Sequence, residues 1–455
     1  MTTVHTVAVI DIGKTHAKVV LFDFVKAKEI WARKINNVPR RDGPYPHHDV
    51  ELLWQFILAA LKDAGTEQRI EAISITTHGA TGVLLDDKGQ LVLPVMDYEF
   101  DGYAAVSEAY AKIRPAFSES GTPRLPVGLN LGLQFYWLQQ TFPQDFARVS
   151  SLVMYPQYWA YRLCGVLAGE VTSLGCHTDL WAPGKGDYSS MVDNLGWRKL
   201  MPPLRKASDE LAMLSNDIAK VTGLPATTPV HCGIHDSNAS LYPHLVSQDQ
   251  PFSVVSTGTW VICMSMSGMP VTLDPARDTL INVNAFGNAV PSSRFMGGRE
   301  YQILMQGHEQ VPMASDAERV TEGGIMLLPA TVENCGPYPS RKAQWVKADG
   351  ISSGQRRVAV SYYLAMMTAT CLELVGAEGP VLVEGPFASN AHFVAMLSAA
   401  TQRDVLLGEA EATGTALGAA LLAHPHPAKQ PPSQRINTAQ DTALSAYAAR
   451  WLDAL

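Results

Sequence analysis

The stretch that most constrains the fold runs from Val7 to Asp23 and reads VAVIDIGKTHAKVVLFD. Two apolar runs, Val7 to Ile10 and Val19 to Phe22, flank a short polar turn. Apolar runs of this length around a turn are typical of two antiparallel strands, so we predict a β-hairpin whose tip faces a ligand. The tip carries the polar and glycine residues Asp11, Gly13, Lys14 and Thr15.

The chemistry of this tip suits a phosphate cradle. Gly13 lets backbone N–H groups approach an anion closely, and Lys14 or Thr15 can donate to phosphate oxygens. Asp11, at the end of a buried strand, can hold a hydrated Mg²⁺ ion. An ordinary hairpin with a polar tip explains the same residues equally well. A P-loop does not, because it needs glycine at position 8 and a following helix, whereas the chain has Ala8 and then a second strand.

Length and composition set the class of protein. A chain of 455 residues exceeds what one hydrophobic core usually serves, so two domains are expected. The net charge of −8, with no basic run, argues against a nucleic-acid partner. No apolar run reaches transmembrane length and no secretory signal precedes the first strand, so we expect a cytoplasmic protein with reduced thiols and no membrane partner.

The remainder of the first half predicts α/β architecture. We expect a loop over Arg33–Asp49, a helix near Val50–Ala64, a buried strand over Ile70–Thr76 and a second hairpin from Gly82 to Pro94. Strand ends are where small-molecule sites form in such folds. The buried strand ends in polar and small residues, Thr77, His78 and Gly79.

A further strand, Gly turn and helix start are expected within Pro229–Ser240. Asp236 lies at the start of that helix, and from its own neighbours a helix N-cap is the better interpretation of this aspartate. His231 and His235 are four residues apart, as helix-borne metal ligands can be, but Gly233 and the strand context make that geometry a poor fit.

The second half restarts the same plan. Phe252–Val255 and Val261–Met264 flank the turn Ser256–Thr259, which again gives strand, Gly/Thr turn and strand. Two such hairpins favour a duplicated core, with a nucleotide held in the cleft between the copies.

Three later segments have distinct patterns. A strand-to-helix turn at Glu384–Asn390 can present N–H groups to a polar ligand. His424–Ser433 is a Pro-rich linker. Thr438–Leu455 is predicted to be an amphipathic helix that docks either on the rest of this chain or on a partner subunit. A homodimer is therefore one of the two possibilities.

Six blocks stand in one order along the chain: DIGKTxxK at Asp11–Lys18, THG at Thr77–Gly79, GIHDS at Gly233–Ser237, STGTW at Ser256–Trp260, EGPFASN at Glu384–Asn390 and EATGTALGAALLA at Glu411–Ala423. In this order and spacing they resemble the FGGY family of carbohydrate kinases, within the actin-like ATPase superfamily. The resemblance implies an α/β fold of two ribonuclease-H-like domains, with a catalytic cleft between them. It implies an N-terminal, sugar-binding domain over residues 1–243 and a C-terminal, nucleotide-binding domain over residues 244–455.

The resemblance also implies roles for individual residues. Asp236 matches the catalytic base, which also contacts the sugar, and Asp11 matches the residue of the Mg-nucleotide site. The nucleotide and phosphate positions are Gly13, Lys14, Thr15, Thr257, Gly258, Thr259, Gly385 and Asn390. The sugar positions are Thr77, His78, Gly79, Asp97, Tyr98, Glu99 and Gln134, with Trp260 as a stacking candidate whose alternative is plain core.

The chain departs from the family pattern mainly on the sugar side. Residues 96–99 replace the usual Trp-Asn-Asp segment, and Gln134 stands where many members carry lysine. On the nucleotide side, Glu384-Gly385 stands where a glycine pair is usual. The SGTW form of the second turn looks most like the rhamnulose and fuculose kinase branch.

We therefore expect phosphorylation of a small ketose or deoxyketose of the L-fuculose or L-rhamnulose type, with ATP and Mg²⁺. A kinase of xylulose, ribulose or a polyol is the alternative within the class. An actin-like nucleotide-dependent chaperone or switch is the rival from another class, against which stands the lack of a separate peptide-binding domain. A non-catalytic protein with a decayed site is disfavoured because Asp11 and Asp236 are both present, although Glu384 keeps it open.

Overall fold

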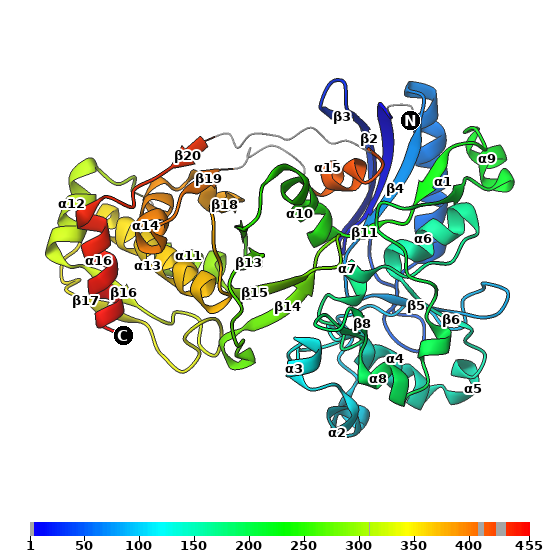
Figure 1. Cartoon of the computed structure of the whole chain (residues 1–455), viewed down its shortest axis with the longest axis horizontal. Coiled ribbons are helices and arrows are strands. Elements are labelled where there is room, and N and C mark those ends of the chain that lie inside the picture. Colours follow the sequence, from blue (N-terminus) through cyan, green and yellow to red (C-terminus); the bar gives the residue numbers. More distant parts are fainter. Residues whose placement is uncertain (1–3, 309, 408–413, 425–433) are drawn as a thin grey trace. The chain divides into compact units, whose positions relative to one another are not determined.

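The computed structural model describes residues 4–308, 310–407, 414–424 and 434–455, which form two compact α/β units (Figure 1). Unit 1 contains residues 4–247, 281–289 and 414–424. Unit 2 contains residues 248–280, 290–308, 310–407 and 434–455. Within these described ranges, no helix combines the length and the apolar character needed to cross a membrane.

Unit 1 is built on a seven-stranded mixed sheet of order β3-β2-β1-β4-β10-β9, in which β11 also pairs with β4. β1 is antiparallel to β2 and parallel to β4. The hairpin predicted over Val7–Asp23 is therefore confirmed. The strands are β1 (Thr6–Ile12), β2 (His16–Asp23), β3 (Lys28–Asn36), β4 (Ala72–Thr77), β9 (Glu210–Met213), β10 (Pro229–His231) and β11 (Ile234–His235).

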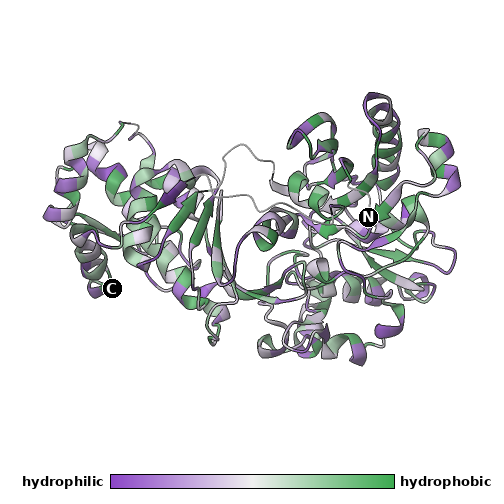
Figure 2. Cartoon of the chain, turned by 45° about the horizontal axis from the view of Figure 1, so that its top comes forward, coloured by the Kyte–Doolittle hydropathy of each residue, from purple (hydrophilic) through white to green (hydrophobic). Residues whose placement is uncertain are grey.

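Helices cover this sheet, so its central strands are buried along their whole length. Every residue of β1 and β4 is buried, and Figure 2 shows the strands largely in the colour of hydrophobic residues. The predicted helix after Asp49 is α1 (Val50–Glu67), and the Asp49 carboxylate caps it by accepting from the Leu52 N–H. α1, α6 (Tyr155–Cys164) and α15 (Gly414–Leu421) pack on the strands.

A second core of unit 1 lies beneath smaller elements, around Tyr110, Phe135 and Trp197. The remaining strands are β5 (Gly82–Leu85), β6 (Ser151–Met154), β7 (Trp181–Ala182) and β8 (Asp187–Tyr188). The remaining helices are α2 (Ala104–Ile113), α3 (Phe117–Ser120), α4 (Leu131–Thr141), α5 (Pro143–Phe146), α7 (Val171–Leu174), α8 (Ser190–Asn194), the 3₁₀ turn η1 (Arg198–Leu200), α9 (Asn216–Thr222) and α10 (Asp236–Ser247).

Two local predictions in unit 1 are correct only in part. The loop expected from Arg33 begins only after Asn36, because β3 continues as a charged strand at the sheet edge, beyond β2. The chain expected to form a hairpin over Gly82–Pro94 does turn back, with a bridge between Leu85 and Leu91 and the Val92 N–H donating to the Leu84 carbonyl at 2.9 Å, but its second arm is not a strand and β5 pairs with β6 instead.

Unit 2 repeats the strand plan of unit 1. Its seven-stranded sheet has the order β14-β15-β13-β12-β18-β19-β20, in which the end of β14 and the first residue of β15 belong to the 281–289 segment grouped with unit 1. The hairpin β12-β13 is antiparallel, like β1-β2 in unit 1. β12 runs parallel to β18, as β1 does to β4. β18 runs parallel to β19, as β4 does to β10. The strands are β12 (Phe252–Thr257), β13 (Val261–Met266), β14 (Thr279–Val283), β15 (Ala289–Phe295), β18 (Val381–Glu384), β19 (Val405–Leu407) and β20 (Gln434–Ile436), with the separate pair β16 (Met326–Leu328) and β17 (Gln344–Val346). The shared order supports the predicted duplication.

The helices of unit 2 are α11 (Gly297–Met305), α12 (Ala314–Gly323), α13 (Ser353–Leu374), α14 (Ala391–Thr401) and α16 (Thr442–Asp453), with the 3₁₀ turns η2 (Pro275–Arg277) and η3 (Pro386–Ser389). The predicted C-terminal helix α16 docks on the core of unit 2 through Tyr447 and Trp451, while Leu452 is exposed. Apart from His424, the predicted Pro-rich linker lies outside the described residues, as do the first three residues of the block that begins at Glu411.

Candidate active site

The carboxyl ends of three strands meet at one edge of the unit 1 sheet. β1 and β4 run parallel with Asp11 opposite Thr76, and β4 and β11 run parallel with His235 opposite Thr77. Residues that follow these strands therefore share one edge. The fold thus brings together Asp11, the Thr77–Gly79 segment and Asp236, which are far apart in sequence.

Asp11 is a buried acid at the end of β1. It is 9% exposed, and its Oδ2 lies 3.5 Å from the Nζ of Lys18. Burial raises the pKa of Asp11 from 3.8 to about 6; Lys18 opposes this rise, and the negative charge of Asp236 adds to it. A second cation at this point would stabilise the ionised form.

The hairpin tip between β1 and β2 is fixed by its own hydrogen bonds. The Gly13 N–H donates to the His16 carbonyl at 2.9 Å, and Asn37 donates from Nδ2 to the Gly13 carbonyl at 2.8 Å. The Gly13 N–H is therefore already used within the hairpin. The Thr15 hydroxyl lies 3.0 Å from Nδ1 of His16 on the exposed side of the turn.

The Lys14 side chain extends from this tip to the acidic segment formed by residues 97–99. Its amine forms an ion pair with Asp97 and lies 3.3 Å from Oε2 of Glu99. The same amine lies 4.8 Å from the centre of the Tyr98 ring. The structure thus joins a predicted phosphate residue to three predicted sugar residues.

His78 presents an unused nitrogen beside these residues. Its Nδ1 lies 3.0 Å from the Gly79 carbonyl, so Nδ1 carries the proton and Nε2 is an acceptor. Within the described part of the chain, Nε2 has no hydrogen-bond partner. The side chain is buried, and burial lowers the pKa of His78. A neutral imidazole with a free acceptor suits a hydroxyl donor, and its ring lies 5.7 Å from that of Tyr98.

Asp236 is the first residue of α10 and keeps one carboxylate oxygen free of strong donors. Its Oδ1 accepts from the Ser237 N–H at 2.6 Å and from the Ser237 hydroxyl at 3.3 Å, and lies 3.2 Å from Nε2 of His235. An N-cap side chain accepts instead from the second or third N–H of the helix. None of the bonds found for Asp236 is of that kind, which weakens the N-cap interpretation.

Two predicted sugar residues are used in local structure. Gln134 is buried, and its Nε2 donates at 2.6 Å to the carbonyls of both Ala80 and Gly128. The buried Thr77 hydroxyl donates to the His78 carbonyl at 3.0 Å. Both side chains fix the backbone around His78.

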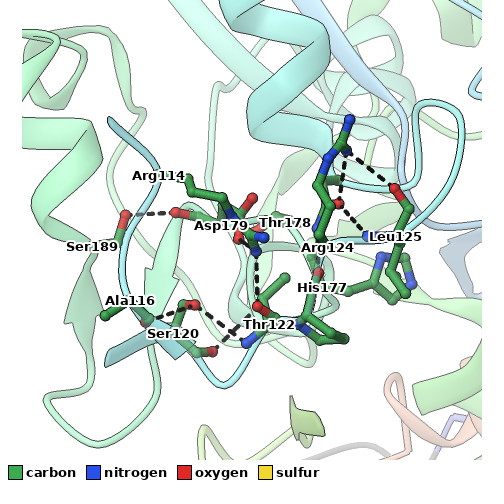
Figure 3. Close-up of polar contacts among 12 residues, drawn as sticks. Arg114, Ala116, Ser120, Thr122, Arg124, Leu125, His177, Thr178, Asp179 and Ser189 are labelled. Carbon is green, nitrogen blue, oxygen red and sulfur yellow. Dashed lines mark hydrogen bonds and ion pairs between the residues drawn. The ribbon is translucent and has the colours of Figure 1, made fainter. Parts of the chain in front are cut away.

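A buried ion pair supports the backbone at His177–Asp179 (Figure 3). Arg114 donates at 2.8 Å both to Oδ1 of Asp179 and to the Thr122 carbonyl, and the Tyr110 hydroxyl donates to Oδ2 at 2.6 Å. His177 and Asp179 both have positive φ, at 46° and 66°, a conformation that non-glycine residues rarely adopt. The ion pair helps to hold this strained backbone in place.

Unit 2 brings the second Gly/Thr turn against the strand-to-helix loop. The Thr257 hydroxyl donates to the Glu384 carbonyl and accepts from the Phe387 N–H at 3.1 Å. Gly385 has φ of 80°, and a Cβ there would lie 2.0 Å from the Thr257 carbonyl oxygen. Glycine is therefore required for the loop to approach the turn.

A pocket of about 560 Å³ opens beside this junction. Its volume lies in the range of small-molecule sites, and two aromatic rings, Tyr301 and Phe387, form part of its wall with centres 5.9 Å apart. Gly258, Thr259 and Asn390, three of the predicted nucleotide residues, also line it. Thr257 and Gly385 adjoin it through the contacts above.

Several pocket residues were missed from the sequence. Arg357 and His392 bring nitrogen donors to the wall, and Gly298 allows close approach, since its Cβ would lie 2.0 Å from the Gly258 carbonyl oxygen. The pair Gly297-Gly298, directly after a strand and at a helix start, was the available signal. Arg357 and His392 carry no local signal, because both lie on helices.

Two other predicted residues have local partners. Asn390 caps α14 by accepting from the Phe393 N–H at 3.2 Å, and its Nδ2 donates to Ser361 at 3.0 Å. Trp260 is half-buried, with the Arg294 guanidinium 4.7 Å above its ring. It therefore stacks on an arginine of its own unit.

Two repeated α/β units, one with a carboxylate edge and one with a pocket of nucleotide size, define a protein of the actin-like fold. Residues 6–242 match the N-terminal domain of the FGGY family of carbohydrate kinases, and residues 249–432 match the carbohydrate kinase FGGY C-terminal domain. The chain belongs to the FGGY family of carbohydrate kinases. The family and fold predicted from the sequence blocks are confirmed.

Individual relatives agree with this assignment. A crystal structure of a carbohydrate kinase from Novosphingobium aromaticivorans matches 100% of the chain and 99% of its own, with 35% identity and a TM-score of 0.92. L-fuculokinase of Escherichia coli K12 is 28% identical over 204 residues, which is 44% of this chain and 43% of that protein. The chain thus spans less than half the length of that curated relative. Glycerol kinase of Plasmodium falciparum with ADP has the same fold, with a TM-score of 0.78 and 14% identity over 99% of this chain and 97% of its own.

Proposed function

We propose that this protein transfers the γ-phosphoryl group of ATP to a hydroxyl of a small sugar. The single observation that carries the proposal is the position of Asp236 at the strand-end edge, with Oδ2 left without a donor among the described residues. A carboxylate in this state can accept the proton of a hydroxyl as it attacks phosphorus.

The sugar-binding part of the proposal rests on unit 1. The free Nε2 of His78 can accept from one sugar hydroxyl, and Asp97 and Glu99, held by Lys14, can accept from others. The ring of Tyr98 lies beside both groups. These are acceptors for an uncharged polyhydroxyl compound, and their net charge disfavours a sugar acid.

The nucleotide-binding part rests on unit 2. The pocket beside Gly258, Thr259 and Asn390 offers aromatic walls for a base, and Arg357 offers a cation for phosphate. The exposed Thr259 can donate to phosphate oxygens, whereas the Gly258 N–H already donates to the Trp260 carbonyl at 2.9 Å. The corresponding role of Gly13, Lys14 and Thr15 in unit 1 remains a prediction, because the Gly13 N–H and the Lys14 amine already have partners.

The residues present fit a Mg²⁺ ion that arrives with ATP. No cluster of three or more ligating side chains occurs in the described ranges, so a resident all-protein site is not supported there. Asp11 offers one carboxylate whose raised pKa a nearby cation would lower. Asp11 would hold the hydrated ion, which when bound neutralises phosphate charge.

For the substrate, we propose a ketose or deoxyketose of the L-fuculose or L-rhamnulose type. The match to L-fuculokinase over part of the chain supports this choice, as does the Ser256–Trp260 block. A "Probable L-xylulose kinase" of Pasteurella multocida, 23% identical over 283 residues, supports keeping xylulose as the alternative. The domain limits 1–243 and 244–455, the cytoplasmic location and the open homodimer also remain predictions.

The test is a coupled assay of ADP release against a panel of ketoses, aldoses, polyols and aldonic acids. We expect turnover to depend on a neutral sugar, with L-fuculose and L-rhamnulose highest. Hydrolysis that needs no sugar and rises on adding an unfolded peptide would favour the chaperone. If the protein bound ATP but turned over none of the sugars, the result would favour the alternative of a non-catalytic protein with a decayed kinase site.

A further inference from the structure

We propose that His235 is a positioning residue for Asp236: its Nε2 donates to Oδ1, which fixes the carboxylate so that Oδ2 receives the proton of the sugar hydroxyl. The inference rests on the proposed function, in which Asp236 is the base. It assigns a role to a histidine whose only earlier interpretation was as a poor metal ligand.

The two carboxylate oxygens of Asp236 have different surroundings. All the close polar contacts found among the described residues reach Oδ1: the N–H and hydroxyl of Ser237 donate to it at 2.6 and 3.3 Å, and Nε2 of His235 lies 3.2 Å away at ion-pair distance. The side chain is 33% exposed, so a ligand can reach the carboxylate. An oxygen that accepts strong hydrogen bonds is a weaker proton acceptor than one that does not. The donors therefore select Oδ2 as the basic atom.

The imidazole of His235 has little freedom to move. Its side chain is only 6% exposed, and its backbone N–H donates to the Thr172 hydroxyl at 3.1 Å. A Cβ on Gly79 would lie 2.5 Å from Nε2. The ring therefore fills the space left by the missing side chain of Gly79, which explains why glycine is needed beside His78.

The groups around His235 favour its charged form. Burial opposes protonation, but the charges of Cys176, Asp236 and Glu170 outweigh it and raise the pKa of His235 to about 9. His177 and His78 also act on the ring from neighbouring segments, and Asp11 acts on Asp236 from β1. At neutral pH the ring is then protonated at both nitrogens, so Nε2 carries a hydrogen beside Oδ1 of Asp236.

The test compares three variants with the intact enzyme. His235→Gln keeps a donor near the position of Nε2 but cannot titrate, and His235→Leu removes the donor. His231→Gln is the matched control, because His231 is also buried but bonds through Nδ1 to the Ser208 carbonyl. With the best sugar of the panel, we expect His235→Leu to lower kcat about 10- to 100-fold with little change in KM, and His235→Gln to restore most of it.

The pH profile separates positioning from a structural effect. We expect the acidic limb of kcat to move to higher pH in His235→Leu and to stay near its normal place in His235→Gln, because a donated hydrogen bond favours the ionised carboxylate. Wild-type kcat and pH profile in His235→Leu would overturn the inference. The inference would also be overturned if His235→Leu lost kcat, His235→Gln did not restore it, and the acidic limb of the pH profile stayed in place in both variants.

A second measurement does not depend on turnover. In protein labelled with ¹³C at aspartate carboxyls, the Asp236 resonance is identified by its loss in Asp236→Asn, and its pKa is followed by NMR titration. We expect that pKa to rise in His235→Leu and to remain unchanged in His231→Gln. An unchanged pKa in His235→Leu contradicts the inference, whereas turnover by Asp236→Asn contradicts the proposed function itself.

Discussion

The amine of Lys14 forms an ion pair with the carboxylate of Asp97, which lies 83 positions away in the chain. This pair, together with Glu99, ties the tip of the first hairpin to the acidic segment proposed to bind the sugar. The lysine side chain is 18% exposed, so its charge is only partly screened by solvent.

The first prediction follows from this pair. Lys14→Met should raise KM for the sugar about three- to tenfold and change KM for ATP less, because it frees Asp97 and Glu99 without touching the pocket of unit 2. Initial rates with each substrate varied in turn measure both constants. A rise confined to the KM for ATP would show that Lys14 serves the phosphates instead.

Asp236→Asn tests the proposed base. The amide cannot accept the hydroxyl proton, so sugar phosphorylation should fall by about 10² to 10⁴. The nucleotide pocket lies in unit 2 and does not contain Asp236, so ATP affinity should stay within a few fold. Equilibrium binding of ATP and the ADP-release assay give the two quantities. Persistent turnover would remove the base assignment.

Gly298→Ala tests the approach of α11 to the second turn. The added Cβ would lie 2.0 Å from the Gly258 carbonyl oxygen, so the turn must shift and KM for ATP should rise at least about tenfold. Gly184→Ala is the matched control, because a Cβ there meets no atom within 4 Å. Equal kinetics of the two variants would show that the turn tolerates displacement.

The raised pKa of Asp11 predicts that this residue lowers the stability of the folded state as the pH rises. Its pKa is higher in the folded state, about 6, than its ordinary value of 3.8, so the folded state binds the proton more tightly and stability is lost as pH rises between these values. Asp11→Asn removes this cost and should stabilise the protein above pH 6 by up to about 3 kcal/mol, with no gain below pH 4. Urea unfolding at several pH values measures the difference, while activity should fall. A gain that does not vary with pH would contradict the assignment.

The Arg114–Asp179 pair predicts a large effect on stability. The Asp179 side chain is fully buried, so Asp179→Ala should destabilise the protein by about 3–5 kcal/mol by leaving Arg114 without its partner. Asp193→Ala, which removes an exposed partner of Arg198, should cost less than about 1 kcal/mol. Urea unfolding of both variants is the comparison. Similar losses would mean that the buried pair is not needed to hold the His177–Asp179 backbone.

The sequence was informative wherever a local pattern carries the structure. Apolar runs around a Gly/Thr turn predicted both hairpins, and Asp49 ahead of an apolar helical face predicted the start of α1. The repeated plan predicted two α/β units. Local pattern failed at β3 and after β5, because edge strands and the choice of strand partner depend on neighbours elsewhere in the chain.

Residue type and order alone were enough to predict the family, the strand plan and Asp11, His78 and Asp236 as candidate site residues. The packing of the chain fixed which atoms meet: the Lys14 amine pairs with Asp97, and Arg357 reaches the nucleotide-sized pocket. The reason is physical. Hydrogen bonds and ion pairs between segments far apart in the chain are fixed by the packing of strands and helices, which no short stretch of sequence encodes.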